Sequence, residues 1–383
     1  MSGAPPAPDF AALRARFPVL RERTYFDTQS VGPFPEQMLI DLDEYRRTLF
    51  LRNRGMALWI ERMEELIGLL ERLLAAPRDA VALMPSATAA QAAIAATQVP
   101  RGRRDRILYT ALDFHSSQYL WEAQKRRGFQ VIEVPSTDGA TPTNGLVERI
   151  DERVAVVALS LVSPRTGALA DLRAIVEVAR ARGALVVVDA YQAVGVVPID
   201  VAALDVDVLV GGTHKWLCGG STGLSFLYVR PALAESLEPV YPGWIGHREM
   251  VGFAPSYEPA RGARRFMQGS PAIEPVYTAR AGLQFVLDAG VEAIRARNLS
   301  LTERLMARAD ERGLSIRTPR PPHARGGSIC LAVEEGERIV AELARDGIDI
   351  DTRPGGVLRV GPHACNTEEE CDRVIDAIGR ARN

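Results

Sequence analysis

Two hydrophobic periodicities alternate along roughly the first 280 residues. Continuous apolar runs bounded by turn residues cover 106–110, 131–134, 154–162, 184–190, 206–212 and 223–230. Unbroken hydrophobicity predicts strands that are covered on both faces, as in a parallel sheet. Between strands, residues 171–183 place Leu172, Ile175 and Val176 on one apolar stripe before a terminating glycine, which predicts a helix. We therefore expect an α/β domain with a large, doubly wound, mostly parallel sheet.

The pattern changes after about residue 280. One long helix is predicted over 277–313, and shorter strands over 327–333 and 357–361 alternate with amphipathic helices over 336–347 and 367–382. This pattern is typical of a small α+β domain. We expect an N-terminal arm (1–23), a large domain (24–280) and a small C-terminal domain (281–383).

Composition narrows the possible classes of protein. The chain has 383 residues, 47% apolar and 25% charged, with a net charge of −2, which gives no electrostatic reason to bind nucleic acid or an anionic membrane. No apolar run approaches the ~20 residues of a membrane span, and the N-terminus lacks the apolar core of a signal peptide. We expect a cytoplasmic protein. Its four cysteines have neither CxxC nor metal-site spacing, which favours packing in the core.

Three features are predicted to meet at one edge of the sheet. Asp189 ends the apolar run 184–190, and Lys215 follows the run 206–212. Parallel strands place their carboxyl ends, and usually the ligand, at the same edge. Alone, these two residues are equally consistent with a structural ion pair. The third feature, Ser86-Ala87-Thr88, precedes an alanine-rich helix whose N-terminus suits an anion, although an ordinary N-cap has the same pattern.

Together these features match the requirements of pyridoxal phosphate. This cofactor needs a lysine amine to react with its aldehyde, a carboxylate beside its ring nitrogen and a helix N-terminus for its phosphate. A lysine at its ordinary pKa is protonated, so a reactive one must be partly desolvated or lie near other cations. We therefore predict that Lys215 and Asp189 are catalytic and that Ser86, Ala87 and Thr88 bind phosphate.

The segments "DAYQ" (189–192) and "GTHKWL" (212–217) carry a specific resemblance. The chain resembles the class V aminotransferases, fold-type I pyridoxal phosphate enzymes that include cysteine desulfurases, kynureninases and isopenicillin epimerases. The resemblance extends from about residue 24 to the end. It implies the fold-type I transferase architecture, a small amino acid substrate and a homodimer with shared active sites.

The resemblance also assigns roles to cofactor-binding residues. In "DFHSSQY" (113–119) it implies that Phe114 stacks on the cofactor, and in "PGWIGHR" (242–248) that Trp244 reaches the phosphate. Gln192 would bind the phenolic oxygen, and His214 would contact phosphate or transfer protons. Ser270, in "RRFMQGSP" (264–271), would reach phosphate across a dimer interface. Without the resemblance, both aromatic residues would be read as core or interface residues.

Substrate contacts are implied by two further segments. "LRVGPHACNTEEECDRVI" (358–375) is similar to the C-terminal block in which an arginine grips the substrate α-carboxylate, which assigns that role to Arg359. "TYFDTQSVGPFP" (24–35) is similar to the kynureninase opening and points to Gln29 and Ser30. We expect the side-chain pocket to form from loops around Gln29, His115, Arg165 and Ser270.

The positions at which this chain departs from the family pattern help to distinguish among the reactions known in the family. The short interval from Arg353 to Arg359 leaves no room for the cysteine-bearing loop of desulfurases, and Cys365 is read as a packing residue. Kynureninases have a tyrosine and a histidine where this chain has His214 and Gln192. The leading hypothesis is a lyase that cleaves the Cβ–S bond of a cysteine conjugate by β-elimination. A kynureninase-like hydrolase, an aminotransferase or epimerase, and a non-catalytic scaffold of the same fold remain alternatives.

Overall fold

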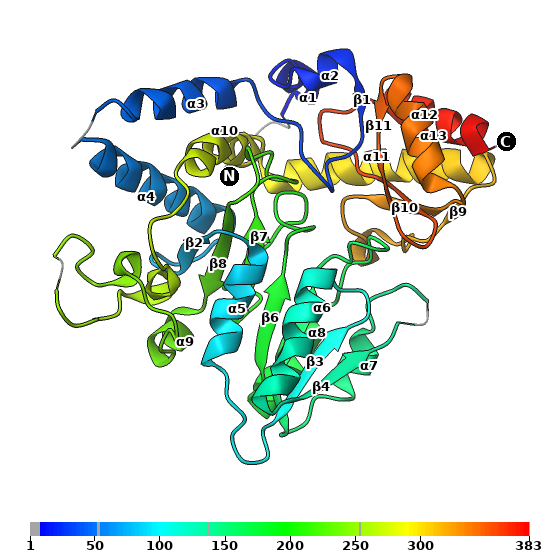
Figure 1. The fold of residues 1–383 in the computed structure, drawn as a ribbon. Coiled ribbons are helices and arrows are strands. Elements are labelled where there is room, and N and C mark those ends of the chain that lie inside the picture. Colours follow the sequence, from blue (N-terminus) through cyan, green and yellow to red (C-terminus); the bar gives the residue numbers. More distant parts are fainter. Residues whose placement is uncertain (1–7, 52–53, 137, 253, 383) are drawn as a thin grey trace, which may run out of the picture.

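A seven-stranded sheet is formed by strands between residues 81 and 229 (Figure 1). The computed structural model describes residues 8–51, 54–136, 138–252 and 254–382. Only β8 runs opposite to the other six strands, so the expected mostly parallel α/β sheet is confirmed. In spatial order the strands are β2 (Val81–Met84), β8 (Ser225–Val229), β7 (Val208–Gly212), β6 (Leu185–Asp189), β5 (Val154–Ser160), β3 (Arg106–Thr110) and β4 (Gln130–Val134).

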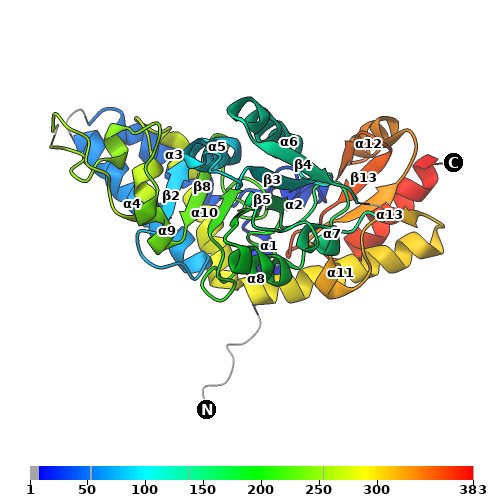
Figure 2. The same cartoon turned by 90° about the horizontal axis from the view of Figure 1, so that it is seen from below.

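Helices cover both faces of this sheet, which is why its central strands are apolar throughout. Every residue of β5, β7 and β8 is buried. Figure 2 shows α5 and α6 on one face and α8 on the other. The helices that follow the strands are α5 (Ala87–Thr97), α6 (His115–Glu122), η2 (Ala123–Arg127), α7 (Thr143–Val147), α8 (Leu172–Arg182) and α9 (Pro231–Ser236).

A helical layer joins the N-terminal segment to the β2 side of the sheet. Helices α3 and α4 both pack against α10. The elements of this layer are α1 (Phe10–Arg14), α2 (Val19–Glu22), α3 (Gln37–Thr48), α4 (Gly55–Leu73), η3 (Trp244–Gly246), η4 (Gly262–Phe266) and α10 (Glu274–Ala289).

A second, antiparallel sheet lies in the C-terminal part, with the strand order β12-β13-β10-β9. The parallel pair of β1 and β11 ties the beginning of the chain to this part, and Phe26 is buried in its core. Its elements are β1 (Thr24–Tyr25), α11 (Val291–Glu311), β9 (Ser315–Ile316), η5 (Pro322–Ala324), β10 (Ile329–Ala332), α12 (Gly336–Arg345), β11 (Ile348–Asp349), β12 (Asp351–Arg353), β13 (Val357–Val360) and α13 (Glu368–Arg382).

The prediction of a single long helix over 277–313 is wrong. The structure has two helices, α10 and α11, which are separated at Gly290. Gly290 has φ +77°, a left-handed conformation that ends α10 and that residues with a Cβ rarely adopt. The apolar pattern continues through this break, so periodicity alone did not reveal it. No helix of the described chain combines the length and hydrophobicity needed to cross a membrane.

The sheet topology brings the ends of several strands, and the loops attached to them, to one edge. Strands β2, β3, β5, β6 and β7 point the same way, and β8 points the opposite way. The carboxyl ends of these five strands and the amino end of β8 therefore meet. Ser160 is paired with Asp189, and Ser225 is paired with both Met84 and Gly212. Side chains that follow these positions must share one region of space.

Candidate functional site

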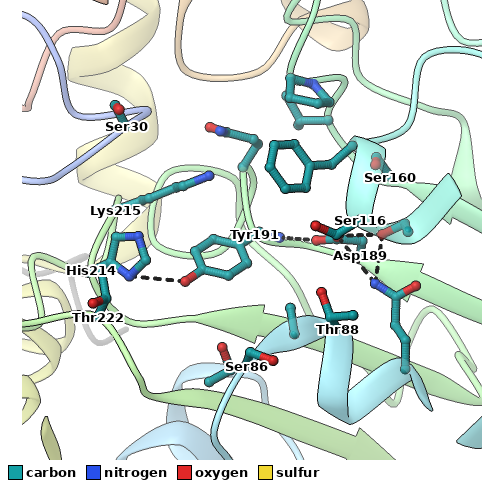
Figure 3. A pocket seen from close by; sticks show the side chains of 18 of the residues that line it. Ser30, Ser86, Thr88, Ser116, Ser160, Asp189, Tyr191, His214, Lys215 and Thr222 are labelled. Carbon is teal, nitrogen blue, oxygen red and sulfur yellow. Dashed lines mark hydrogen bonds between the residues drawn. The ribbon is translucent and has the colours of Figure 1, made fainter. Parts of the chain in front are cut away.

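A cavity of about 360 Å³ opens at this edge of the sheet (Figure 3). Its size falls within the usual range for small-molecule sites. Nine residues selected from sequence line it, namely Ser30, Ser86, Ala87, Thr88, Phe114, Asp189, Gln192, His214 and Lys215. The other lining residues are Pro85, Gln91, Ser116, Ser117, Ser160, Val162, Pro164, Tyr191, Thr222, Gly223, Ser225 and Arg353.

Lys215 presents its amine to this cavity from the turn after β7. Its Nζ lies 4.5 Å from the ring centre of Tyr191 and 5.8 Å from that of Phe114. Burial and the positive charge of Arg359 together lower the pKa of Lys215 to about 8, while Asp189 opposes the shift. A much larger fraction of the amine is therefore neutral and nucleophilic near neutral pH than in a solvent-exposed lysine.

Asp189 is held rigidly at the end of β6. Its Oδ1 accepts a hydrogen bond from the Tyr191 N–H at 2.9 Å, and its Oδ2 accepts longer bonds of 3.4 Å from both Gln91 and Ser117. Gln91 is itself fixed, because it donates to Ser117 at 2.9 Å and accepts from Trp121 Nε1 at 3.0 Å. Burial raises the pKa of Asp189, while the Tyr191 bond and the charge of Lys215 oppose this shift. A cationic ring nitrogen beside Asp189 would stabilise its ionised form.

His214 and Tyr191 form a pair inside the cavity. The Tyr191 hydroxyl lies 3.0 Å from His214 Nδ1. Burial, and then the neighbouring charge of Lys215, lower the pKa of His214 to about 4, so its imidazole is neutral at neutral pH. Gly212 makes room for the Tyr191 ring, because a Cβ at position 212 would lie 1.9 Å from Tyr191 Cζ. The positions 191 and 212 are thus sterically coupled.

The N-terminus of α5 forms another wall of the cavity. Ser86 is the N-cap, and its hydroxyl accepts a hydrogen bond from the Ala89 N–H at 3.0 Å. The first N–H groups of a helix have no partner within the helix, and the helix dipole makes this end positive. In Figure 3, Ser86 and Thr88 lie below Tyr191, on the same side of the cavity as each other. This wall can accept a phosphate group.

Two other residues selected from sequence take up defined positions. Phe114 precedes α6, and its side chain is 43% exposed, so its ring is available to stack on a ligand. Gln192 lines the cavity, but its amide group is already used. Its Nε2 donates to the Gln29 carbonyl at 2.8 Å, and its Oε1 accepts from Trp216 Nε1 at 3.1 Å.

Four of the selected residues lie outside the lining of this cavity. Gln29 is fully buried behind it, and Trp244 packs against the large core. Ser270 lines a neighbouring cavity of about 140 Å³. Arg359 is 2% exposed and forms a two-pronged ion pair with Asp351, with Nε 2.8 Å from Oδ1. The role of Ser270 at a partner's site and the role of Arg359 at a substrate carboxylate stay predictions.

Several lining residues were not recognised from sequence. Ser117 lies in the segment 113–119 and Tyr191 in the segment 189–192, but the resemblance assigns no role to either residue. Gln91 carried a usable signal, because it is the one polar residue in the stretch "AAQAAIAA" (89–96), and a lone amide in an apolar helix needs a buried partner. Arg353 had no such signal, since its approach to the cavity depends on how the C-terminal sheet packs against the large domain.

The side chains that line the cavity fit pyridoxal phosphate. An amine with a lowered pKa, an anchored carboxylate, an exposed aromatic ring and a helix N-terminus surround one space of suitable size. Lys215 would hold the cofactor aldehyde, Asp189 the ring nitrogen, and the start of α5 the phosphate. Among the described residues, no three His, Cys, Asp or Glu side chains are grouped as a metal site requires.

Comparisons with known proteins agree with this fit. The family described as Aminotransferase class-V matches residues 25–373. An uncharacterized aminotransferase, YcbU of Bacillus subtilis, is 31% identical over 365 residues, covering 95% of this chain and 96% of the relative. A kynureninase of Deinococcus radiodurans is also 31% identical over 365 residues, covering 92% of this chain and 88% of the relative.

Solved structures share the fold. A cysteine desulfurase from Thermococcus onnurineus NA1 superposes with a TM-score of 0.86 at 21% identity, covering 97% of each chain. The cystine C–S lyase C-DES, in complex with cysteine persulfide, gives a TM-score of 0.85 at 21% identity, covering 95% of this chain and 99% of the other. At this identity the likeness concerns the fold alone.

We predict that replacing Lys215 removes the covalently held cofactor. The sequence contains only two lysines, Lys125 and Lys215, and Lys125 is exposed on η2 and pairs with Glu122 at 2.5 Å. After reduction with borohydride, peptide mapping should find the cofactor on Lys215 alone. Lys215→Ala should lack both the visible absorbance and the labelled peptide, whereas Lys125→Ala should keep both. Labelling at Lys125 in the wild type would contradict the assignment.

The lowered pKa of Lys215 predicts a pH dependence. Because only the neutral amine attacks an aldehyde, the rate at which cofactor-free protein takes up pyridoxal phosphate should rise with pH through a midpoint of about 8. A solvent-exposed lysine would give a midpoint of the uptake rate at about pH 10.4. Stopped-flow absorbance between pH 6 and pH 10.5 measures this. A midpoint above ~10 would show that the amine is solvated.

The contact between Gly212 and Tyr191 predicts a non-additive pair of substitutions. Gly212→Ala should push the Tyr191 ring into the cavity and weaken cofactor binding by roughly tenfold, or about 1.4 kcal/mol. In a Tyr191→Ala background the same change at position 212 should have less than about a twofold effect, because the obstructing ring is gone. Spectrophotometric titration of the four cofactor-free proteins gives the coupling. Additive effects would mean that the ring does not fill this space.

Proposed function

The chain belongs to the aminotransferase class-V family of pyridoxal phosphate-dependent enzymes, and from that premise we propose that it cleaves the Cβ–S bond of a cysteine conjugate. The overall reaction converts the conjugate and one water molecule into a thiol, pyruvate and ammonia. One observation carries the proposal. A reactive lysine faces an anchored carboxylate in a cavity whose lining contains no cysteine.

The cysteines of this chain support elimination over sulfur transfer to the protein. A desulfurase that stores sulfur needs a cysteine thiolate near the substrate. Here Cys218, Cys330, Cys365 and Cys371 are all buried, and none lines the cavity. Burial raises the pKa of each of these thiols, so they remain protonated and poorly nucleophilic.

The chemistry divides among the cavity residues. When bound, the cofactor would withdraw electrons from the substrate Cα. Lys215 Nζ would take the proton from Cα. Asp189 would hold the ring nitrogen in its protonated form, which favours that electron withdrawal. The Cβ–S bond would then break, and its electron pair would leave with sulfur. Phe114 would cover the ring and limit the access of water.

His214 is suited to form hydrogen bonds as a neutral imidazole and not to carry a positive charge. Its pKa of about 4 keeps the imidazole neutral, and its Nδ1 is occupied by the Tyr191 hydroxyl. Nε2 is thus the nitrogen that remains for phosphate or for the leaving group. We assign His214 and Tyr191 to positioning of the cofactor phosphate end, beside the start of α5.

A kynureninase-like hydrolase is the second candidate. It is favoured by the relatives named kynureninase, among them the one at 31% identity, and by the segments 24–35 and 242–248. An aminotransferase is the third, favoured by the relative YcbU, whose name gives that activity. A non-catalytic scaffold is disfavoured, because a lysine with a lowered pKa and an anchored aspartate serve no evident packing purpose.

A homodimer remains part of the proposal. Large apolar side chains are exposed on α3 and the turn after it, with Ile40 61% exposed and Phe50 85% exposed. Tyr241 and Val251, in the long segment between α9 and η4, are also about two-thirds exposed, at 66% and 68%. Exposed apolar groups of this size are typical of surfaces that bind another chain.

A panel of three assays tests the proposed reaction. Purified holoenzyme is incubated with S-substituted cysteines, with kynurenine, and with an amino donor plus a 2-oxo acid. We expect pyruvate and thiol from the first mixture only. Lys215→Ala should lower that turnover by at least roughly 10²- to 10⁴-fold, since it removes the general base. Anthranilate from kynurenine, or amino transfer without pyruvate, would replace our proposal with the second or third candidate.

A further inference from the structure

A second cavity, of about 330 Å³, opens beside the first. The two cavities share Phe114, Pro164 and Arg353 as wall residues. Since the Phe114 ring centre is 5.8 Å from Lys215 Nζ, the second cavity begins within one side-chain length of the reactive amine. A substrate whose Cα lies at Lys215 can therefore extend its side chain past Phe114 into this space.

The walls of the second cavity are strongly basic. Three arginines line it, and they come from segments far apart in sequence: Arg165 follows β5, Arg317 follows β9, and Arg353 ends β12. His115 adds a fourth basic side chain. The convergence of three guanidinium groups on one cavity is costly unless an anion binds among them, because like charges repel.

Two of these arginines are not neutralised by the protein. Within the part of the chain that the structure describes, no carboxylate lies within 4.0 Å of Arg165 or Arg317. Arg165 makes only a long contact of 3.5 Å with Gln118, and Arg317 donates to the Gly355 carbonyl at 2.9 Å. Both side chains belong to exposed residues, so their hydrogen-bonding groups remain available to a ligand.

The acidic groups nearby are already engaged. Asp113 is the one acidic residue of the lining, and it is buried with its two oxygens accepting from the N–H groups of Thr110 and Ser160 at 2.8 and 2.6 Å. Asp351 pairs with Arg353 at 2.9 Å and also with Arg359. Asp351 is thus shared by two guanidinium groups, and Asp27 also interacts electrostatically with both of them, so the uncompensated positive charge of the second cavity rests on Arg165 and Arg317.

We propose that the substrate carries a second anionic group at the end of its side chain, and that Arg165 and Arg317 bind it. The inference rests on the proposed function, since it describes the group attached to sulfur in the cysteine conjugate. A carboxylate is the anion that a guanidinium fork binds most directly. Arg353, on the wall common to both cavities, faces the middle of such a substrate. The substrate class is therefore S-carboxyalkyl cysteines and similar anionic conjugates.

Matched pairs of substrates test this assignment. S-carboxymethyl- and S-(2-carboxyethyl)-cysteine are compared with their uncharged amides, which have nearly the same shape. For at least one chain length, kcat/KM for the acid should exceed that for the amide by roughly 10- to 100-fold, as expected for charged hydrogen bonds. Arg165→Gln and Arg317→Gln should each reduce this preference by lowering kcat/KM for the acid. Arg103→Gln, an exposed arginine before β3, is the matched control and should change neither rate.

A binding measurement separates this inference from the proposed reaction. The same acid and amide pairs are titrated into the holoenzyme, and the change in cofactor absorbance reports binding whether or not turnover follows. Tighter binding of the acid without any elimination would overturn the proposed reaction but keep the anionic subsite. Equal affinities for acid and amide at both lengths, or a preference that survives both arginine substitutions, would overturn the anionic subsite. Arg317→Glu should also shift preference toward S-(2-aminoethyl)-cysteine, a cationic conjugate.

Discussion

The site depends on keeping an amine and a carboxylate out of water, close to each other but not in contact. Asp189 ends β6, and Lys215 follows the neighbouring parallel strand β7. Both line one cavity, yet they are not within ion-pair distance. Burial opposes both charges, lowering the pKa of Lys215 and raising that of Asp189. The hydrogen bonds from Tyr191, Gln91 and Ser117 hold the carboxylate back, so the space between the two groups stays open for a ring. A direct ion pair would close that space and return Lys215 to its charged form.

Much of the large domain could be predicted, because its strands are buried on both faces and read as unbroken apolar runs. The runs at 106–110 and 154–162 correspond to β3 and β5, and α8 begins at Leu172, one residue inside the expected helix, with Asp171 as its N-cap. The break at Gly290 could not be predicted from periodicity, since a glycine is tolerated inside a helix and the apolar stripe continues beyond it. The positive φ of Gly290, which the apolar pattern does not show, ends α10 there.

Some residues of the candidate site could likewise be predicted from the sequence, and others could not. Lys215 and Asp189 were predictable because their positions follow from where strands end. The environment of Arg359 was not, since it depends on strand register. The antiparallel pairing of β12 with β13 places Asp351 directly opposite Arg359, and two glycines with positive φ, Gly355 and Gly356, make the tight turn that sets this register. A substrate carboxylate that binds Arg359 must therefore compete with Asp351, whereas Arg353 already reaches the cavity.

The residues proposed to catalyse the reaction and the residues proposed to select the substrate lie on different parts of the molecule. The groups proposed to hold the cofactor lie at the ends of strands of the central sheet and at the start of α5, where backbone geometry leaves little freedom. Of the arginines of the second cavity, Arg165 and Arg317 lie on loops, and Arg353 ends β12 of the C-terminal sheet. Loops tolerate substitution that the sheet does not. Side chains on these loops can therefore vary without disturbing the sheet that positions Lys215 and Asp189, so one fold can accommodate different substrates.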